Sequence, residues 1–337
     1  MATKTVLITG VSGFVGIQIL KSFVSAGYFV RGSVRTQKSA VQVSNAANRL
    51  GVLGSKFELV IVPDITAPGS FDSHLDGVDG IVHVASPFYY HVKKFDDVYI
   101  PAVHGTLEIL KSAAKRTDGN IKRVVITSSF AAVQDFSKST QSGCVYTEKD
   151  WNLITKERAE KIKPLQYAAS KKLAEVAAWD FIENERPSFS LATINPPMIY
   201  GPIAQTNSIA NLNQSALDIW NLLNGQTKEV PPTPMPAYCD VRDVAEAHLK
   251  AFEYPTGGRF LPVGGSFLFQ DICAILKEVA PEWAKNVPNP ESRPRNQHYE
   301  VNNSRTREEL NISFRGLRET ITDMVESYRG MQPASKI

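Results

Sequence analysis

The chain has 337 residues, of which 43% are hydrophobic and 21% charged, and its 37 Lys and Arg residues against 34 Asp and Glu leave a formal net charge of +3. This composition is typical of a globular protein and excludes a disordered chain, and the basic and acidic residues are too evenly mixed to favour a nucleic-acid partner. The length suits one large α/β domain, alone or with a smaller appended domain.

Short β-branched runs alternate with helical patterns over the first two-thirds of the chain. The runs are apolar nearly throughout, which is typical of parallel strands covered on both faces. Between them lie segments with helical spacing, such as 14–27, where Gly27 is placed to end a helix. The alternation predicts an α/β fold with a Rossmann-type, doubly wound parallel sheet and right-handed crossovers. The predicted strands lie in TVLITG, YFVRGSVR, FELVIVPDI, GIVHVASP, KRVVITSS and FSLATINP.

The first predicted strand leads directly into a glycine-rich turn. Its glycines form G-x-x-G-x-x-G between the strand and a helix. Small residues let the backbone approach a ligand closely, and the amides and dipole of a helix N-terminus attract a pyrophosphate, so the turn predicts a dinucleotide site. A tight strand-to-helix turn without a ligand is the competing interpretation. The residues expected at the cofactor here are Gly10, Ser12, Gly13, Phe14, Val15 and Gly16.

The end of the second strand indicates which dinucleotide binds. A carboxylate there would accept a hydrogen bond from a ribose hydroxyl of NAD, but RGSVRTQK contains no acid. Arg35 can instead grip a 2′-phosphate through two hydrogen bonds, with Ser33 as a further donor and Lys38 adding charge. The sequence therefore predicts NADP(H) as the cofactor. The alternative is that Arg35 and Lys38 are ordinary surface cations.

The ends of the third and fourth strands are expected at the same site. Asp64 in VPDIT, with Ile65 beside it, is placed to accept a hydrogen bond from an adenine amino group. Capping a helix N-terminus is the competing role for this carboxylate. Ala85 and Ser86 in HVASP are small enough for a cofactor to pass over them.

The fifth strand, in KRVVITSSFAAV, ends in three hydroxyl residues. Thr127, Ser128 and Ser129 are expected at the same edge as the glycine turn, because the carboxyl ends of parallel strands share one edge of a sheet. Thr127 is expected beside the cofactor. Tyr167 and Lys171 follow on the next long helix, where they share a face one turn apart.

The Tyr-x-x-x-Lys spacing of this pair occurs twice more in the chain. Tyr89 with Lys93 and Tyr90 with Lys94 follow a proline in a loop, with no hydroxyl-bearing strand nearby. These tyrosines are therefore assigned to the wall or rim of a substrate pocket.

The residue types of the selected pair suit carbonyl reduction. Hydride addition to a carbonyl builds negative charge on oxygen, which needs a proton donor and an electrostatic stabiliser. Tyr167 is the expected donor, and the Lys171 ammonium is expected to lower its pKa and to hold the ribose of the nicotinamide. Ser129 is expected to orient the substrate oxygen. Ser128 stays open as an alternative, because neighbouring residues at a strand end point opposite ways.

The chain changes character near residue 200. Segments 201–214 and 229–243 are rich in proline and irregular, which favours a smaller C-terminal substrate lobe. We expect residues 1–200 to form an NADP-binding Rossmann domain and 201–337 to form mainly the substrate lobe, with 238–265 returning to the first domain. An amphipathic terminal helix is predicted within 314–330.

Cysteine usage and the ends of the chain bear on its location. The three cysteines lie far apart, which fits free thiols in a reducing compartment. We expect no signal peptide and no membrane span, hence a cytoplasmic protein without a membrane partner. The final Ser-Lys-Ile differs by one residue from a peroxisomal address, which remains a minor alternative. The six histidines lie in separate elements without ligand spacing, so no metal site is expected.

Several motifs in order carry a family resemblance. TGVSGFVG, SVR, HVASPF, PAVHGTLEIL, VVITSSFAAV, YAASKKLAE, NPPMIYGP and DVRDVAEAHL together resemble the extended short-chain dehydrogenases/reductases over nearly the whole chain. Within them the chain is most similar to the branch of yeast NADPH-dependent methylglyoxal and carbonyl reductases, plant dihydroflavonol reductases and cinnamoyl-CoA reductases. Ala102 lies near a position where many members of the wider family carry Asn, so a proton relay through that Asn is not supported.

The resemblance implies a Rossmann fold and assigns roles to individual residues. Ser129, Tyr167 and Lys171 correspond to the catalytic triad. Residues Pro196 to Ile199 are implied on the nicotinamide side of the cofactor. The implied substrate pocket, with the Tyr89 assigned above, comprises Phe88, Tyr89, Phe130, Pro197, Tyr200 and the segment 203–240.

These observations favour an NADPH-dependent ketoreductase or aldehyde reductase, with a small-molecule carbonyl substrate. A nucleotide-sugar epimerase or dehydratase is the second enzyme hypothesis, although the lobe is rich in apolar residues where those enzymes bind a diphosphate. A protein that senses NADPH without turnover is the alternative from another class. The helices predicted near 97–115 and 165–184 could pair two copies, so the chain is expected to be a monomer or a homodimer.

Overall fold

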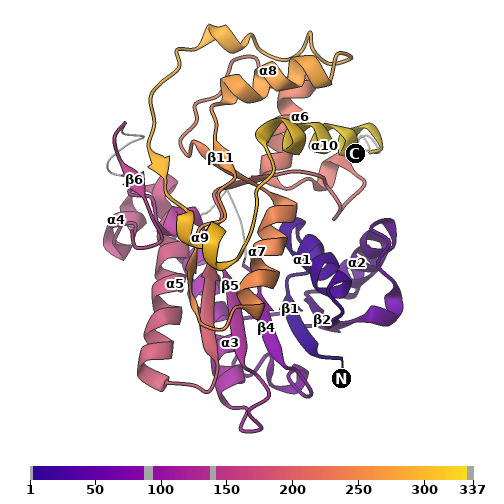
Figure 1. Cartoon of the computed structure of the whole chain (residues 1–337), viewed down its shortest axis with the longest axis vertical. Helices are drawn as coiled ribbons and strands as arrows, with labels where there is room; N and C mark the ends of the chain where they lie inside the picture. Colours follow the sequence, from indigo (N-terminus) through magenta and orange to yellow (C-terminus); the bar gives the residue numbers. More distant parts are fainter. Residues whose placement is uncertain (1–2, 87–93, 137–141, 332–337) are drawn as a thin grey trace.

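A large parallel sheet forms the centre of the protein. The computed structural model describes residues 3–86, 94–136 and 142–331 (Figure 1). The sheet has seven strands in the order β10-β7-β5-β4-β1-β2-β3, and all its neighbouring strands are parallel. The predicted doubly wound α/β fold is confirmed. The strands are β1 (Thr5–Thr9), β2 (Phe29–Val34), β3 (Phe57–Ile61), β4 (Gly80–His83), β5 (Arg123–Thr127), β7 (Ser190–Ile194) and β10 (Gly258–Phe260).

Helices cover both faces of this sheet. Successive strand residues point to opposite faces, so Val6 and Ile8 pack under one helical layer and Leu7 under the other. The first layer holds α1, α2 and α7, and the second holds α3 and α5, which lie side by side in Figure 1. The bounds of these helices are α1 (Phe14–Ser25), α2 (Gln37–Arg49), α3 (Asp96–Ala114), α5 (Gln166–Glu185) and α7 (Val241–Glu253).

A smaller lobe lies beyond the carboxyl edge of the sheet (Figure 1). Its apolar core joins α6 (Gln214–Leu223), α8 (Phe269–Val279) and α10 (Leu317–Arg329). A three-stranded sheet of β8 (Met198–Tyr200), β9 (Ala237–Asp240) and β11 (Gly265–Ser266) connects the two parts. The remaining elements are β6 (Val145–Tyr146), α4 (Lys156–Lys161), β12 (Glu300–Val301) and α9 (Ser304–Glu309).

The chain passes between the two parts more than once. After the lobe begins, α7 returns to pack on α1, and β10 adds an edge strand to the large sheet beside β7. Strand β9 instead pairs with β8 in the connecting sheet. The two parts are therefore built from interleaved segments, and the cleft between them lies at the strand ends.

Candidate active site

The glycine turn after β1 is shaped by two of its three glycines. Gly10 has φ +70° and a Cβ on it would lie 2.9 Å from the Ala85 amide nitrogen, while a Cβ on Gly16 would lie 2.2 Å from the Gly10 carbonyl oxygen. A Cβ on Gly13 would meet only that same oxygen, at 3.5 Å, which is an ordinary contact. The fold itself thus requires glycine at two positions but leaves space in front of Gly13.

The N-terminus of α1 faces this space with its first amides unclaimed by a side chain. Gly13 is the N-cap residue, no side chain caps the helix, and its first turn holds no acidic residue. The first amides of a helix lack acceptors within the helix, and the helix dipole adds positive potential there. This arrangement fits the pyrophosphate of a dinucleotide.

The ends of β2 and β3 line the same cavity. Ser33 is buried and Arg35 is exposed, and both contribute to the wall, whereas Lys38 is exposed and is not among the described lining residues. The Asp64 carboxylate accepts hydrogen bonds from the Thr66 amide (2.8 Å) and hydroxyl (2.7 Å). These bonds lower the pKa of Asp64, and the charge of Arg35 lowers it further. Asp64 therefore caps a turn and also lines the cavity.

A buried histidine that sequence reasoning left without a role supports the fourth strand end. The Thr9 hydroxyl accepts from the amides of Val84 and Ala85, both at 3.0 Å, so its own proton points to His83 Nδ1 at 2.9 Å. His83 is thus the neutral tautomer with its proton on Nε2. Burial lowers the pKa of His83 to about 3, and the charge of Lys171 contributes to that shift. Through Thr9, His83 therefore helps to join the end of β1 to the residues that follow β4.

The structure brings Ser129, Tyr167 and Lys171 together at the cavity wall. The hydroxyls of Ser129 and Tyr167 are hydrogen-bonded, and the Lys171 Nζ lies 5.9 Å from the centroid of the Tyr167 ring. Burial raises the pKa of Tyr167, and the bond from Ser129 opposes that rise. Burial lowers the pKa of Lys171 to about 8. A proton donor, a hydroxyl partner and a cation thus share one wall.

The two serines at the end of β5 have different partners. Ser129 Oγ meets Tyr167, whereas Ser128 Oγ donates to the buried Glu175 carboxylate at 2.5 Å. Thr127 donates to His248 Nε2 at 2.7 Å, because His248 Nδ1 donates its proton to the Val244 carbonyl. Only Ser129 of the two serines has its hydroxyl directed to the tyrosine.

One cavity of about 1260 Å³ connects the glycine turn to this wall. It exceeds the volume of about 300–1,000 Å³ that is usual for a single small ligand, so it has room for a cofactor and a substrate. Every cofactor residue predicted from the sequence lines it except Lys38. The predicted cofactor residues that line the cavity are Gly10, Ser12, Gly13, Phe14, Val15, Gly16, Ser33, Arg35, Asp64, Ile65, Ala85, Ser86, Thr127, Pro196 and Ile199.

The structure places only some of the predicted substrate-pocket residues at the cavity. Pro197 lines the cavity, but Phe130 and Tyr200 are fully buried and are not among its described lining residues. Phe130 stacks with Tyr299 in a separate apolar cluster, and Tyr200 packs in the lobe core. Phe88 and Tyr89 lie outside the described residues. Met198, Pro234 and Met235 line the cavity and lie within the predicted ranges 196–199 and 203–240. The sequence did not single out Ala131 and Phe136, which are also in the wall.

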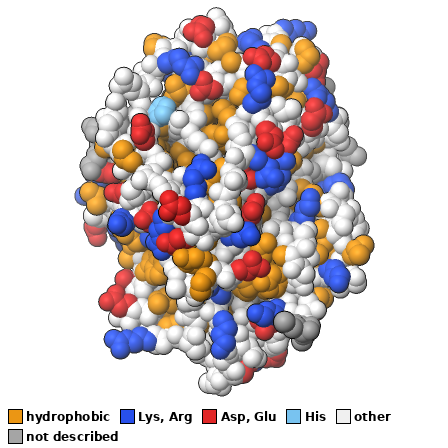
Figure 2. All heavy atoms as spheres, in the orientation of Figure 1, with side chains coloured by type: hydrophobic (Ala, Val, Ile, Leu, Met, Phe, Trp, Pro, Cys, Tyr) orange, Lys and Arg blue, Asp and Glu red, His pale blue; other side chains and the backbone are white. Residues whose placement is uncertain are grey.

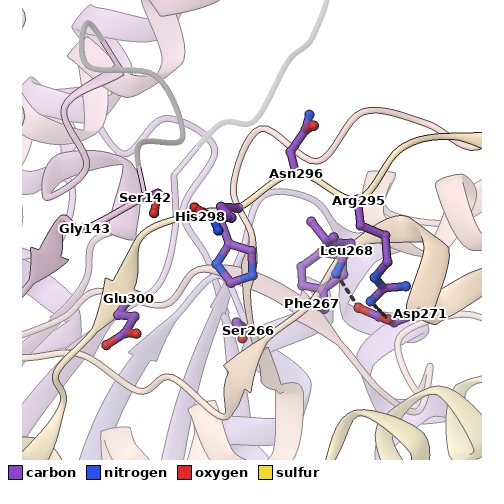
Figure 3. Close-up of a pocket in the computed structure, with 11 residues that line it drawn as sticks. Ser142, Gly143, Ser266, Phe267, Leu268, Asp271, Arg295, Asn296, His298 and Glu300 are labelled. Atoms are coloured by element: carbon purple, nitrogen blue, oxygen red, sulfur yellow. Dashed lines mark hydrogen bonds and ion pairs between the residues drawn. The ribbon is translucent and has the colours of Figure 1, made fainter.

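A second, more polar hollow of about 590 Å³ lies between β12, β11 and the start of α8 (Figure 3). Arg295 points toward Asp271 there and forms an ion pair with it, and the second oxygen of Asp271 accepts from the Leu268 amide at 2.8 Å. His298 Nδ1 is bonded to the carbonyl of the neighbouring Tyr299. Arg295 and Asp271 therefore neutralise each other in this hollow.

The described part of the chain has neither a group of side chains suited to a metal ion nor a helix suited to cross a membrane. Its His, Cys, Asp and Glu side chains nowhere gather in a group suited to a metal ion. None of its helices is both long and apolar enough to cross a bilayer. Figure 2 shows Lys and Arg interspersed with Asp and Glu on the face in view.

A parallel sheet with a glycine turn after β1 and a Ser-Tyr-Lys group beside that turn defines a dinucleotide-dependent oxidoreductase of the extended short-chain type. The model of the NAD dependent epimerase/dehydratase family matches residues 6–261. The chain belongs to this family.

Individual relatives narrow the comparison. The chain is 42% identical over 298 residues to a putative uncharacterized oxidoreductase of Schizosaccharomyces pombe, covering 86% of each protein. It is 33% identical over 333 residues to the NADPH-dependent methylglyoxal reductase of Saccharomyces cerevisiae, covering 95% of this chain and 96% of the relative. A crystal structure of yeast methylglyoxal/isovaleraldehyde reductase complexed with NADPH matches with a TM-score of 0.89 and 32% identity, covering 96% of this chain and 98% of the other. The predicted resemblance to the yeast reductases is confirmed.

Proposed function

We propose that this protein is an NADPH-dependent carbonyl reductase that converts an aldehyde or ketone to an alcohol. The observation that carries the proposal is the hydrogen-bonded pair of Ser129 and Tyr167 with Lys171 beside it, on the wall of a cavity that continues to the glycine turn. Relatives described as NADPH-dependent reductases support the same chemistry. The cytoplasm is the proposed location.

In this proposal the protein supplies a proton and a prepared electrostatic environment. NADPH supplies the hydride when bound. Ser129 donates a hydrogen bond to the substrate oxygen, and Tyr167 gives its phenolic proton to that oxygen as charge develops. The Lys171 ammonium stabilises the phenolate that remains. The Tyr167 phenol is protonated at neutral pH, since burial raises its pKa; the expected lowering by Lys171 does not outweigh burial in the cofactor-free protein.

The wall of the lobe lacks the cations that the diphosphate of a nucleotide sugar would need. The described lobe residues that line the cavity are Asn213, Gln214, Ser215, Pro234 and Met235, and none of them is Lys or Arg. A diphosphate buried there would lack the cation that such a group needs. A turnover screen of aldehydes, diketones, β-ketoesters and aryl ketones with NADPH and NADH tests the proposal, and failure to oxidise NADPH with any of them would contradict it.

Replacing Arg35 with alanine is expected to weaken NADPH binding about 10–100-fold and NADH binding less than about threefold. Arg35 lines the cavity at the end of β2, where a 2′-phosphate would receive its charge-assisted bonds. The dissociation constants of both cofactors, measured by fluorescence, check this. Lys38→Ala is the matched control, since Lys38 does not line the cavity, and equal losses for both cofactors in Arg35→Ala would refute the phosphate-binding role.

Lys171 is expected to react selectively with cyanate in the cofactor-free protein. The neutral amine is the reactive form, and a pKa of about 8 means that its fraction rises steeply as pH increases from 7 to 9. Peptide mass spectrometry should show carbamylation of Lys171 ahead of Lys172, whose amine donates to the Ile154 carbonyl at 3.1 Å. Saturating NADPH should slow the reaction at Lys171 alone. Labelling that NADPH leaves unchanged would place Lys171 away from the cofactor.

A further inference from the structure

A buried carboxylate on α5 is tied to three strands of the sheet. Glu175 is 1% exposed and lies on the same side of the helix as Tyr167 and Lys171, two turns beyond Tyr167 and one turn beyond Lys171. Four strong donors converge on its two oxygens. They are Ser128 Oγ (2.5 Å) and Asn195 Nδ2 (2.6 Å) on one oxygen, and Arg259 Nε (2.6 Å) and Thr193 Oγ1 (3.0 Å) on the other.

The cation that pairs with this carboxylate is itself held in place. Arg259 on β10 donates through Nη1 to the carbonyls of Glu148 (2.6 Å) and Asp150 (2.7 Å). Its guanidinium carbon lies 3.7 Å from the centroid of the Trp151 ring. Glu175 is therefore anchored from the far edge of the sheet and cannot easily shift along the helix axis.

The network reaches the catalytic serine by two routes. Ser128 is the neighbour of Ser129 and its hydroxyl donates a hydrogen bond to Glu175. Asn195 bonds Glu175 with the same amide nitrogen that donates to the Ser129 carbonyl at 3.3 Å. The backbone of Ser129 is thus fixed to α5 on both sides, while its Oγ meets Tyr167 on that same helix.

We propose that Glu175 is a positioning residue that fixes the end of β5 against α5 and so holds the Ser129 hydroxyl on the Tyr167 hydroxyl. The proposal rests on the proposed function. A buried ion pair is a costly way to add stability compared with apolar packing, but four directional bonds define a single spacing between a helix and a strand. Carbonyl reduction depends on that spacing, because a misplacement of about 1 Å can cost about 10²-fold in rate.

The Ser128→Ala substitution tests this with the smallest change. It removes one bond to Glu175 and leaves Ser129, Tyr167 and Lys171 in place. We expect kcat to fall about tenfold with the dissociation constant of NADPH unchanged within about twofold, because the hydroxyl that is removed bonds to Glu175. Glu175→Gln removes the charge and should lower kcat about 100-fold; if that variant fails to fold, Ser128→Ala still decides.

Ser112→Ala is the matched control for a purely structural loss. Ser112 is 1% exposed and donates to the Asp72 carboxylate at 2.6 Å, away from the cavity. It should lose a similar amount of thermal stability without the loss in kcat. An equal fall of kcat in both variants would contradict a positioning role.

A second readout does not depend on turnover. In protein with tyrosines labelled at Cζ, the carbon signal of Tyr167, assigned through Tyr167→Phe, reports its hydrogen bond to Ser129. Ser128→Ala should move this signal in the same direction as Ser129→Ala, whereas Ser112→Ala should leave it in place. An unmoved signal in Ser128→Ala overturns the positioning role even if the chain proves inactive on carbonyls, and absence of turnover in the unmodified chain overturns only the proposed function.

Discussion

Tyr167→Phe is expected to lower kcat for carbonyl reduction about 10³-fold while NADPH affinity stays within about twofold. The substitution removes only the phenolic oxygen, which is the proton donor, and general acid catalysis contributes about 10²–10⁴-fold. The ring that lies beside Lys171 remains. Steady-state turnover of an active carbonyl substrate together with a fluorescence titration of NADPH measures both quantities.

Tyr28→Phe provides the control for this experiment. Tyr28 lies just before β2, at the opposite edge of the sheet, and its hydroxyl donates to Glu253 at 3.1 Å. Its loss should leave kcat unchanged. If Tyr167→Phe keeps full turnover, another group donates the proton. If neither Tyr28→Phe nor Tyr167→Phe shows any turnover while both bind NADPH, a sensing role becomes the better hypothesis.

The sheet was predictable because each of its strands leaves a strong local pattern. Parallel strands buried on both faces are apolar nearly throughout, and the predicted runs for β1 to β5 and for β7 all appear in the large sheet. The alternation predicted helices between the strands, but α2 was not located, since most of its residues are polar and only one narrow side, including Val43 and Ala46, is buried. Helix α8 in the lobe was missed as well. A weakly apolar helix becomes evident only when its partner surface is known.

The site was predictable where the residues that act together lie close together in the sequence. The glycine turn and the Tyr167–Lys171 pair each lie in one short segment, so their spacing is visible in the sequence. The partners of Glu175 are far apart along the chain, from Ser128 to Arg259, and only the strand order brings them together. Phe130 and Tyr200 were predicted in the substrate pocket but are buried elsewhere, because a neighbour of a site residue in the sequence can direct a buried aromatic ring to the other side.

Alanine at Gly16 should destabilise the cofactor-free protein, whereas alanine at Gly13 should leave its stability nearly unchanged. A Cβ on Gly16 would lie 2.2 Å from a backbone oxygen, so the turn must deform, and we expect a loss of about 1–3 kcal/mol in the free energy of unfolding. Gly13 has φ −84° and ψ 168°, which alanine adopts without strain, and its Cβ meets nothing closer than 3.5 Å. Gly13→Ala should therefore change stability by less than about 1 kcal/mol. Urea unfolding measures both.

The same two substitutions distinguish a position where the fold requires glycine from one where the ligand requires it. In Gly13→Ala the new methyl group fills the space in front of the α1 N-terminus, so NADPH affinity should fall at least about tenfold although the apo protein is intact. A ligand at 100 times its dissociation constant stabilises a protein by about 2.7 kcal/mol, and a tenfold weaker site loses about half of that. The shift of Tm on adding NADPH should therefore shrink in Gly13→Ala. An undiminished shift would mean that the pyrophosphate does not approach Gly13, and the space at this helix end would then have no ligand in the proposed reaction.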